Sequence, residues 1–118
     1  MTAPQMIAHL TDQMHHALGD SPVRARPGVL RWSVVRFASI YLLPWPKGRI
    51  QGPAEAFLTQ PADWEADVGG LVHLLQRFAT RGPAGVWPDH ALMGRMKGRD
   101  WGVFVHKHFD HHFRQFGV

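Results

Sequence analysis

Residues 98–116 read GRDWGVFVHKHFDHHFRQF and carry the pattern that decides the fold. At about 3.6 residues per turn, one face of a helix over this stretch holds large apolar side chains together with His108 and His112. The apolar members of that face are Trp101, Phe104, Val105 and Phe116. His106 falls on the far side of the helix and His111 on its flank. The stretch predicts an amphipathic helix from about Gly98 to Phe116 with two histidines in the middle of its apolar stripe.

The spacing of His108 and His112 is one helical turn, so both imidazoles project the same way and can reach one ion, with bonds of about 2.0–2.1 Å to a zinc-like metal. Phe109 stands where the metalloprotease motif has a general-base glutamate, which disfavours that class. The alternative is a pair of hydrogen-bonded core histidines, each with ring nitrogens that cost about 1–3 kcal/mol if left unpaired. Gln115, at helical spacing from His112, can orient a ligand ring or a bound water.

The N-terminal segment predicts a second helix, from about Thr2 to Leu18. Thr2 and Gln5 form a capping-box pattern, and Gly19 begins the stop signal. Its apolar face consists of Met6, Ile7, Leu10, Met14, Ala17 and Leu18. A polar edge beside that face consists of His9, Gln13 and His16, and this edge can face a cavity.

A third metal ligand must come from a different helix than the one that holds His108 and His112. His9 is the leading candidate, because it sits at the apolar edge of the N-terminal helix, and His16 two turns later is the rival. Three neutral imidazoles leave a fourth coordination position for water or substrate, as in catalytic rather than closed structural sites. The sequence thus predicts a metal site made of His108, His112 and a third histidine, for which His9 ranks before His16.

The middle of the chain holds two further segments and a loop. Leu30–Leu43 is apolar on nearly all sides, and its length favours a helix over a strand. Residues 44–53 predict a loop in which Lys47 and Arg49 either touch a ligand or are ordinary surface charges. A helix is expected from about Asp63 to Arg81, with a stripe made of Trp64, Val68, Leu71, Leu75 and Phe78. Within it, Gly69 and Gly70 either admit a close helix or are tolerated defects, and His73 points away.

Length and composition limit the class of protein. The 118 residues, 45% hydrophobic and 19% charged, fit one compact domain over residues 1–118. The chain has no cysteine, which excludes thiol nucleophiles and cysteine-ligated metals, whereas nine histidines exceed ordinary usage of about 2–3%. The net charge of +4 is weak support for any partner. With no signal-peptide pattern and no apolar run of bilayer length, a cytoplasmic protein without a membrane segment is expected.

The two ends of the chain together resemble the DinB-like superfamily of metal-binding four-helix bundles. The opening MTAPQMIAHL (1–10) and the closing HFDHHFRQFG (108–117) carry the resemblance, which is to an uncharacterised branch of that superfamily and covers nearly the whole chain. It implies an all-α, up-and-down helical bundle. It also implies that one early histidine and a His-x-x-x-His pair bind a divalent metal, which corresponds to His9, His108 and His112. Characterised relatives include thiol-dependent transferases and isomerases and metal-dependent hydrolases.

One departure from the superfamily concerns the N-terminus. Members usually carry a further helix before the one with the first histidine, whereas here Thr2 already resembles a helix cap. Either the start site omits that helix or a partner subunit covers the exposed face. The second alternative predicts a homodimer whose interface includes the Met6/Leu10/Met14 surface or the Trp32–Leu43 surface.

Two classes of function follow from these residues. The first is a metal-dependent enzyme that acts on an unknown small molecule, either a transferase, with or without a thiol cosubstrate, or a hydrolase. Its divalent ion is expected to be zinc or nickel rather than copper or iron. The second is a non-catalytic structural module, or one that binds anions or nucleic acid through Arg24, Arg26, Arg31, Arg36, Lys47 and Arg49. Nucleic acid is the weaker expectation, because no recognition-helix pattern accompanies these charges.

Overall fold

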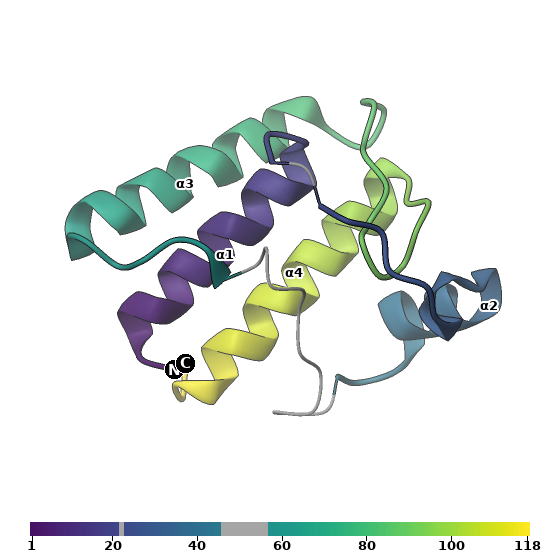
Figure 1. The fold of residues 1–118 in the computed structure, drawn as a ribbon, viewed down its shortest axis with the longest axis horizontal. Coiled ribbons are helices and arrows are strands. Elements are labelled where there is room, and N and C mark those ends of the chain that lie inside the picture. The colour runs from purple at the N-terminus through teal and green to yellow at the C-terminus, as the bar shows by residue number, and fades with distance from the viewer. Residues whose placement is uncertain (22, 46–56) are drawn as a thin grey trace.

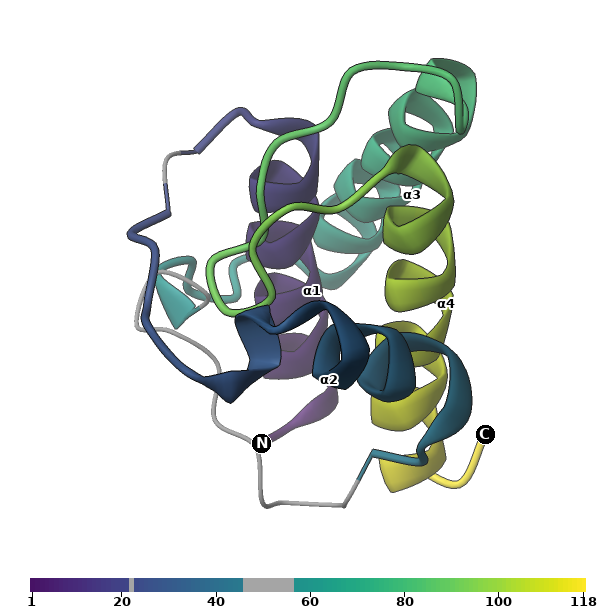
Figure 2. The same ribbon diagram turned by 90° about the vertical axis from the view of Figure 1, so that its right-hand side faces the viewer.

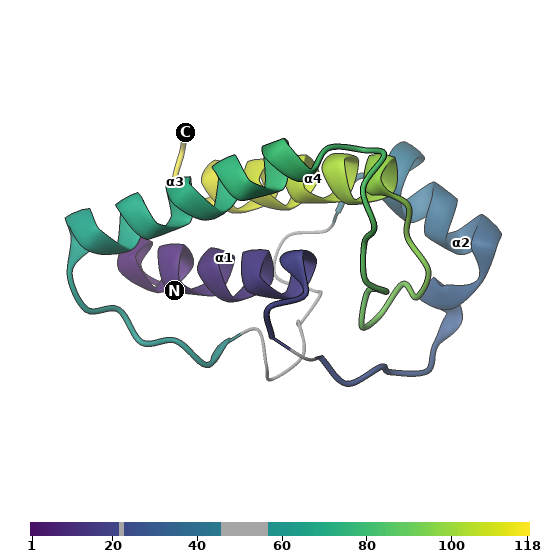
Figure 3. The ribbon, with the colours of Figure 1, turned by 90° about the horizontal axis from the view of Figure 1, so that it is seen from above.

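The computed structural model describes residues 1–21, 23–45 and 57–118. Three long helices, α1 (Ala3–Leu18), α3 (Trp64–Arg81) and α4 (Gly98–Gln115), lie side by side in Figures 1 and 3. α1 and α3 run in the same direction and α4 runs in the opposite one, so the N- and C-termini lie close together (Figure 1). Within the described ranges every regular element is helical apart from a single bridge between His90 and Gly94, which confirms an all-α fold. No helix in those ranges has the length and apolar character needed to cross a bilayer.

α1 begins and ends where the capping pattern predicts. The Thr2 hydroxyl accepts a hydrogen bond from the Gln5 backbone N–H, and the Gln5 side chain accepts one from the Thr2 backbone N–H. Gly19 closes the helix at φ 79°, a left-handed conformation that glycine adopts without a steric penalty. The whole predicted apolar face of α1 is buried.

α3 packs along α1, and its termini also follow the sequence. The Asp63 carboxylate caps the helix by accepting from the Ala66 N–H, and Gly82 ends it. The buried contacts to α1 come from Leu71 and Leu74, with Val68, Leu75 and Phe78 partly buried. Trp64 is 51% exposed, so the predicted stripe is wrong at its first position.

Two smaller expectations for α3 also have outcomes. A Cβ added at Gly69 or Gly70 would meet no described atom within 4 Å, so none of the described helices approaches there and the two glycines are tolerated defects. His73 is exposed, as expected. The buried residues between α1 and α3 form the first core of the molecule.

The apolar segment 29–43 is helical, but it is not one buried helix. A 3₁₀ turn (Val29–Arg31) is separated by the extended residue Trp32 from α2 (Ser33–Phe37), which continues into a π-helical turn (Ala38–Leu42). Figures 1 and 2 place this segment on the outside of the molecule beside α4. Of its residues only Ile40 is buried, because a segment that is apolar all round can turn just one face to a neighbouring helix.

α4 carries the second core. Its first residue, Gly98, has no room for a side chain, because a Cβ there would lie 2.3 Å from the Pro83 carbonyl oxygen. Trp101 and Phe104 are buried with Ile40 and with the methionines of the 82–97 segment, as the predicted stripe requires. Phe116, the last member of that stripe, is 38% exposed, because it lies beyond the end of the helix. The central part of the stripe, which holds the histidines, faces α1.

The candidate homodimer surfaces differ in exposure. Met6, Leu10 and Met14 are buried against α3 within one chain, so the expectation that they form a subunit interface is wrong. On segment 29–43, by contrast, large apolar side chains are more than half exposed: Val29, Trp32, Val34, Phe37, Leu42 and Leu43.

Candidate metal centre

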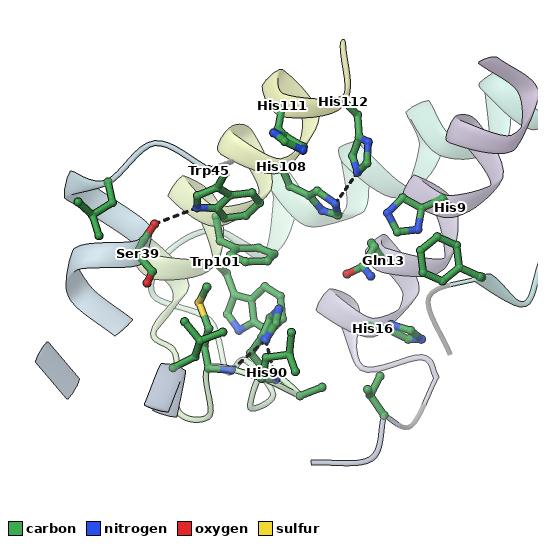
Figure 4. A pocket seen from close by; sticks show the side chains of 18 of the residues that line it. His9, Gln13, His16, Ser39, Trp45, His90, Trp101, His108, His111 and His112 are labelled. Carbon is green, nitrogen blue, oxygen red and sulfur yellow. Dashed lines mark hydrogen bonds between the residues drawn. The ribbon is translucent and has the colours of Figure 1, made fainter. Parts of the chain in front are cut away.

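Three histidines from two antiparallel helices meet between α1 and α4. His9 comes from the polar edge of α1, and His108 and His112 come from successive turns of α4 (Figure 4). One ligand nitrogen of each lies within 4.8 Å of one ligand nitrogen of each of the others. His9 is 5% exposed and His112 is 8% exposed. The structure therefore brings together the three residues that the sequence singled out, whereas His16 lies outside this group.

The ring of His112 is oriented from both sides. Its Nδ1 lies 3.1 Å from Oε1 of Gln115, and its Nε2 lies 2.9 Å from Nε2 of His108. Because an amide oxygen only accepts hydrogen bonds, the proton of neutral His112 sits on Nδ1, which leaves a lone pair on Nε2. The amide nitrogen of Gln115 lies 3.4 Å from Nε2 of His111, which holds the amide in this orientation. Gln115 thus occupies the orienting position that its spacing predicts.

Burial and neighbouring histidines keep His108 and His112 uncharged at neutral pH. Burial lowers the pKa of His112 to about 4, and the neighbouring His9 and His111 add to that effect, whereas the bond to Gln115 opposes it. Burial, followed by the proximity of His112 and His9, holds the pKa of His108 well below its ordinary value. Metal ligands must be deprotonated, and both rings are neutral. With the proton of His112 on Nδ1, the contact between the two Nε2 atoms requires the proton of His108 on Nε2, so an ion bound there needs that proton on Nδ1 instead.

His9 is held by a segment that is distant in sequence. The buried carboxylate of Asp12, one turn further along α1, accepts hydrogen bonds from the backbone N–H groups of Leu58 and Thr59, both at 2.9 Å, and from the Thr59 hydroxyl. These bonds fix the chain next to Phe57, whose ring stacks on His9 with 4.5 Å between centroids and 11° between planes. Phe57 covers one face of the imidazole and limits its rotation.

The triad lies in the wall of a cavity of about 660 Å³. Gln13 and His16 line the same cavity, so the polar edge of α1 does face a cavity, as predicted. His111, on the flank of α4, also lines it, whereas His106 is exposed. The aromatic part of the wall consists of Trp45, Phe57, Trp101, Phe104 and Phe116. The space is large enough for a small organic molecule next to the triad.

One aromatic wall of the cavity is fastened to α4. Trp45 donates from its indole nitrogen to the Ser39 carbonyl at 2.9 Å, and Lys107 donates to the same carbonyl at 2.8 Å and also to that of Leu43. The Tyr41 hydroxyl donates to Asp100 near the start of α4. These bonds keep the end of segment 29–43 beside the triad.

Two of the arginines in the alternative anion-binding hypothesis hold the fold together. Arg31 donates to the Ala91 carbonyl at 3.1 Å, and Arg36 donates to the Met93 carbonyl at 3.0 Å. Both therefore fasten the 90–96 turn to segment 29–43. Lys47 and Arg49 lie outside the described residues.

Sequence reasoning missed three residues of this region. Asp12 shares the edge of α1 with His9 and His16, so helical spacing held a signal for it. His90 and Phe57 lie outside the long helices, where no periodicity indicates the direction of a side chain. His90 is buried and lines the cavity.

Comparisons with known proteins give no family for the chain. No protein-family model matches it, and neither a curated protein nor a solved structure does.

Proposed function

We propose that the protein binds one divalent metal ion through His9, His108 and His112 and uses it on a small molecule held in the adjoining cavity. The observation that carries this proposal is the convergence of three histidine nitrogens within 4.8 Å, contributed by two different helices. Burial lowers the pKa of His108 and of His112, so both rings are neutral and each has a nitrogen lone pair to offer an ion. Nitrogen donors of this kind suit zinc or nickel.

The chemistry of the proposed site is that of a metal-dependent transferase, with or without a thiol cosubstrate, or a hydrolase. A divalent ion held by three imidazoles polarises a carbonyl oxygen or lowers the pKa of a bound water or thiol. The chain's own residues orient the ligands and shield the site: Gln115 fixes the His112 ring, and Phe57 covers His9. The cavity gives a substrate access to the triad.

The same residues support the proposal that the chain is a DinB-like protein. The resemblance implies one histidine from an early helix and a His-x-x-x-His pair from the last helix, and α1 and α4 supply that set. We also propose that the chain forms a homodimer through segment 29–43. Its exposed apolar side chains, which include Val34 at 79% exposure, support this proposal.

The metal content of purified, untagged protein tests the proposed site. Elemental analysis is expected to find about one equivalent of metal in the wild type and a loss of that metal in His108→Ala and His112→Ala. His106→Ala and His73→Ala remove exposed histidines and serve as matched controls that keep the metal. A wild type without metal that also fails to bind added zinc or nickel would contradict the proposal and favour a structural or anion-binding role.

A further inference from the structure

His90 is a cavity residue for which the proposed metal site gives no role. It lies in the turn before α4 and is 8% exposed. Its Nδ1 accepts hydrogen bonds from two backbone N–H groups, those of Leu92 at 3.0 Å and Met93 at 3.2 Å. The turn itself is held by Arg31 and Arg36, so the position of the imidazole is fixed by the backbone around it.

Those two hydrogen bonds determine which ring nitrogen carries the proton. A nitrogen that accepts from backbone N–H groups has no hydrogen of its own, so the proton of neutral His90 is on Nε2. Within the described part of the chain, no hydrogen-bond partner is found for that Nε2–H. Burial, with a smaller effect from His16 and Arg31, lowers the pKa of His90 to about 4, so the ring is neutral at physiological pH.

The position of His90 in the cavity suggests what this N–H binds. Figure 4 shows His90 and the triad on opposite sides of the open space, with the hydrogen bonds of His90 on one edge of its ring. Phe104 lies between the two sides, with its ring centroid 4.6 Å from that of His90 and 5.8 Å from that of His108. The wall between the donor and the triad is therefore an aromatic ring.

A second metal site at His90 and His16 is the competing interpretation. Metal-bound histidines usually bind through one nitrogen and donate a hydrogen bond from the other. His90 has the reverse arrangement, because its Nδ1 already accepts two hydrogen bonds and its Nε2 holds the proton. Binding a metal through Nε2 would require an imidazolate, whereas donating a hydrogen bond requires no change.

We propose that His90 is a fixed hydrogen-bond donor whose Nε2–H binds an acceptor oxygen, carbonyl or carboxylate, of a small molecule in the cavity. The apolar body of that molecule packs on Phe104, and its other end faces the triad. The proposal that the far end of this molecule faces the triad rests on the proposed metal function, whereas the donor role of His90 does not. The substrate class is thus an oxygen-bearing compound with an aryl or alkyl body.

Three small probes of nearly the same shape test the donor. Acetophenone and benzoate present an acceptor oxygen on a phenyl ring, whereas α-methylstyrene replaces the carbonyl oxygen of acetophenone with a methylene group. Dissociation constants are measured by calorimetry for wild type, His90→Phe and the control His106→Phe, each with and without zinc. The Phe variant keeps an aromatic ring and removes the N–H.

Only the His90→Phe variant is expected to lose the preference for the oxygen probes over α-methylstyrene. Relative to α-methylstyrene, at least one oxygen probe binds about five- to tenfold less well to His90→Phe than to wild type, as expected for the loss of one hydrogen bond. His106→Phe behaves like wild type. Equal ratios in wild type and His90→Phe, or no binding of either oxygen probe to wild type, would overturn the proposal.

A second measurement uses the wild type alone, so it does not depend on the folding of a variant. In ¹⁵N-labelled protein, the Nε2–H resonance of His90 is expected to be present and to shift when acetophenone or benzoate is added. A proton found on Nδ1, or an Nε2 resonance that neither probe shifts, would overturn the proposal. If wild type fails to bind zinc but still binds an oxygen probe more tightly than α-methylstyrene, only the proposed metal function would be overturned.

Discussion

Gln115 connects two histidines, because its amide oxygen accepts from His112 and its amide nitrogen faces His111. We predict that Gln115→Leu lowers zinc affinity about 10- to 100-fold, since an unoriented ligand ring must be ordered on binding. Calorimetric titration with zinc measures the change. Gln76→Leu, an exposed substitution on α3, is the control and leaves the affinity unchanged. Unchanged zinc affinity in Gln115→Leu would show that the amide does not orient the ligand.

His90 predicts a dependence of stability on pH. Its folded-state pKa of about 4 lies below the unfolded value of 6.5, so between these values the unfolded chain binds more protons. Stability from this residue is therefore complete above about pH 6.5 and is lost as the pH falls towards 4. Urea unfolding measures how much the free energy of unfolding falls between pH 7 and pH 4.5. This fall is expected to be about 2 kcal/mol smaller in His90→Phe than in wild type.

The control for that pH dependence is His73→Phe, because His73 is exposed. This variant is expected to lose as much stability as wild type over the same pH range. Identical pH dependence in wild type and His90→Phe would contradict the account of a neutral, buried His90.

How much of the site the sequence predicts depends on where each residue lies. His108, His112 and Gln115 share one helix, so their spacing alone determines their common direction. The meeting of His9 with them depends on how α1 and α4 pack, which the sequence suggested only through an edge of polar residues. His90 lies in a turn whose backbone bonds orient it, and no spacing rule predicts those bonds.

At the scale of elements, Asp12 joins α1 to the segment that precedes α3. We predict that Asp12→Ala lowers the free energy of unfolding by about 2–3 kcal/mol, because two backbone N–H groups and the Thr59 hydroxyl lose a charged acceptor. Zinc affinity is also expected to fall, since Phe57 is no longer held against His9. Urea unfolding and zinc titration measure the two effects.

Thr59→Val is the matched control for that prediction. It removes the hydroxyl contact with Asp12 and leaves the two backbone bonds, so its effect on stability is expected to be clearly smaller. An Asp12→Ala variant as stable as wild type would show that segment 57–59 is not fastened through this carboxylate.

The elements differ in how well the sequence predicts them. α1 and α3 have side-chain caps at their starts and glycine at their ends, and these local signals predicted their limits to within a residue or so. Segment 29–43 has no helical periodicity in its apolar residues, because its own side chains are apolar on nearly every face. Its division at Trp32 and its position outside the core depend on contacts with α4 and the 90–96 turn, which lie far along the chain.

For the whole molecule, the exposed apolar surface of segment 29–43 predicts self-association. Light scattering with size-exclusion chromatography is expected to give a dimer for wild type and a monomer for Val34→Lys, which places a charge in the proposed interface. Val86→Lys changes a 92% exposed valine elsewhere in the molecule, so this control is expected to remain a dimer. A monomeric wild type, or a dimeric Val34→Lys, would contradict the proposed interface.

The central claim is that His9, His108 and His112 hold one metal ion together. X-ray absorption at the zinc edge of the zinc-loaded, untagged protein tests it most directly, because the technique counts imidazole ligands around the metal. The account predicts three imidazole nitrogens at about 2.0–2.1 Å in wild type, and fewer imidazoles in His9→Ala. A zinc environment with fewer than three imidazoles in wild type, or one that His9→Ala leaves unchanged, would contradict it.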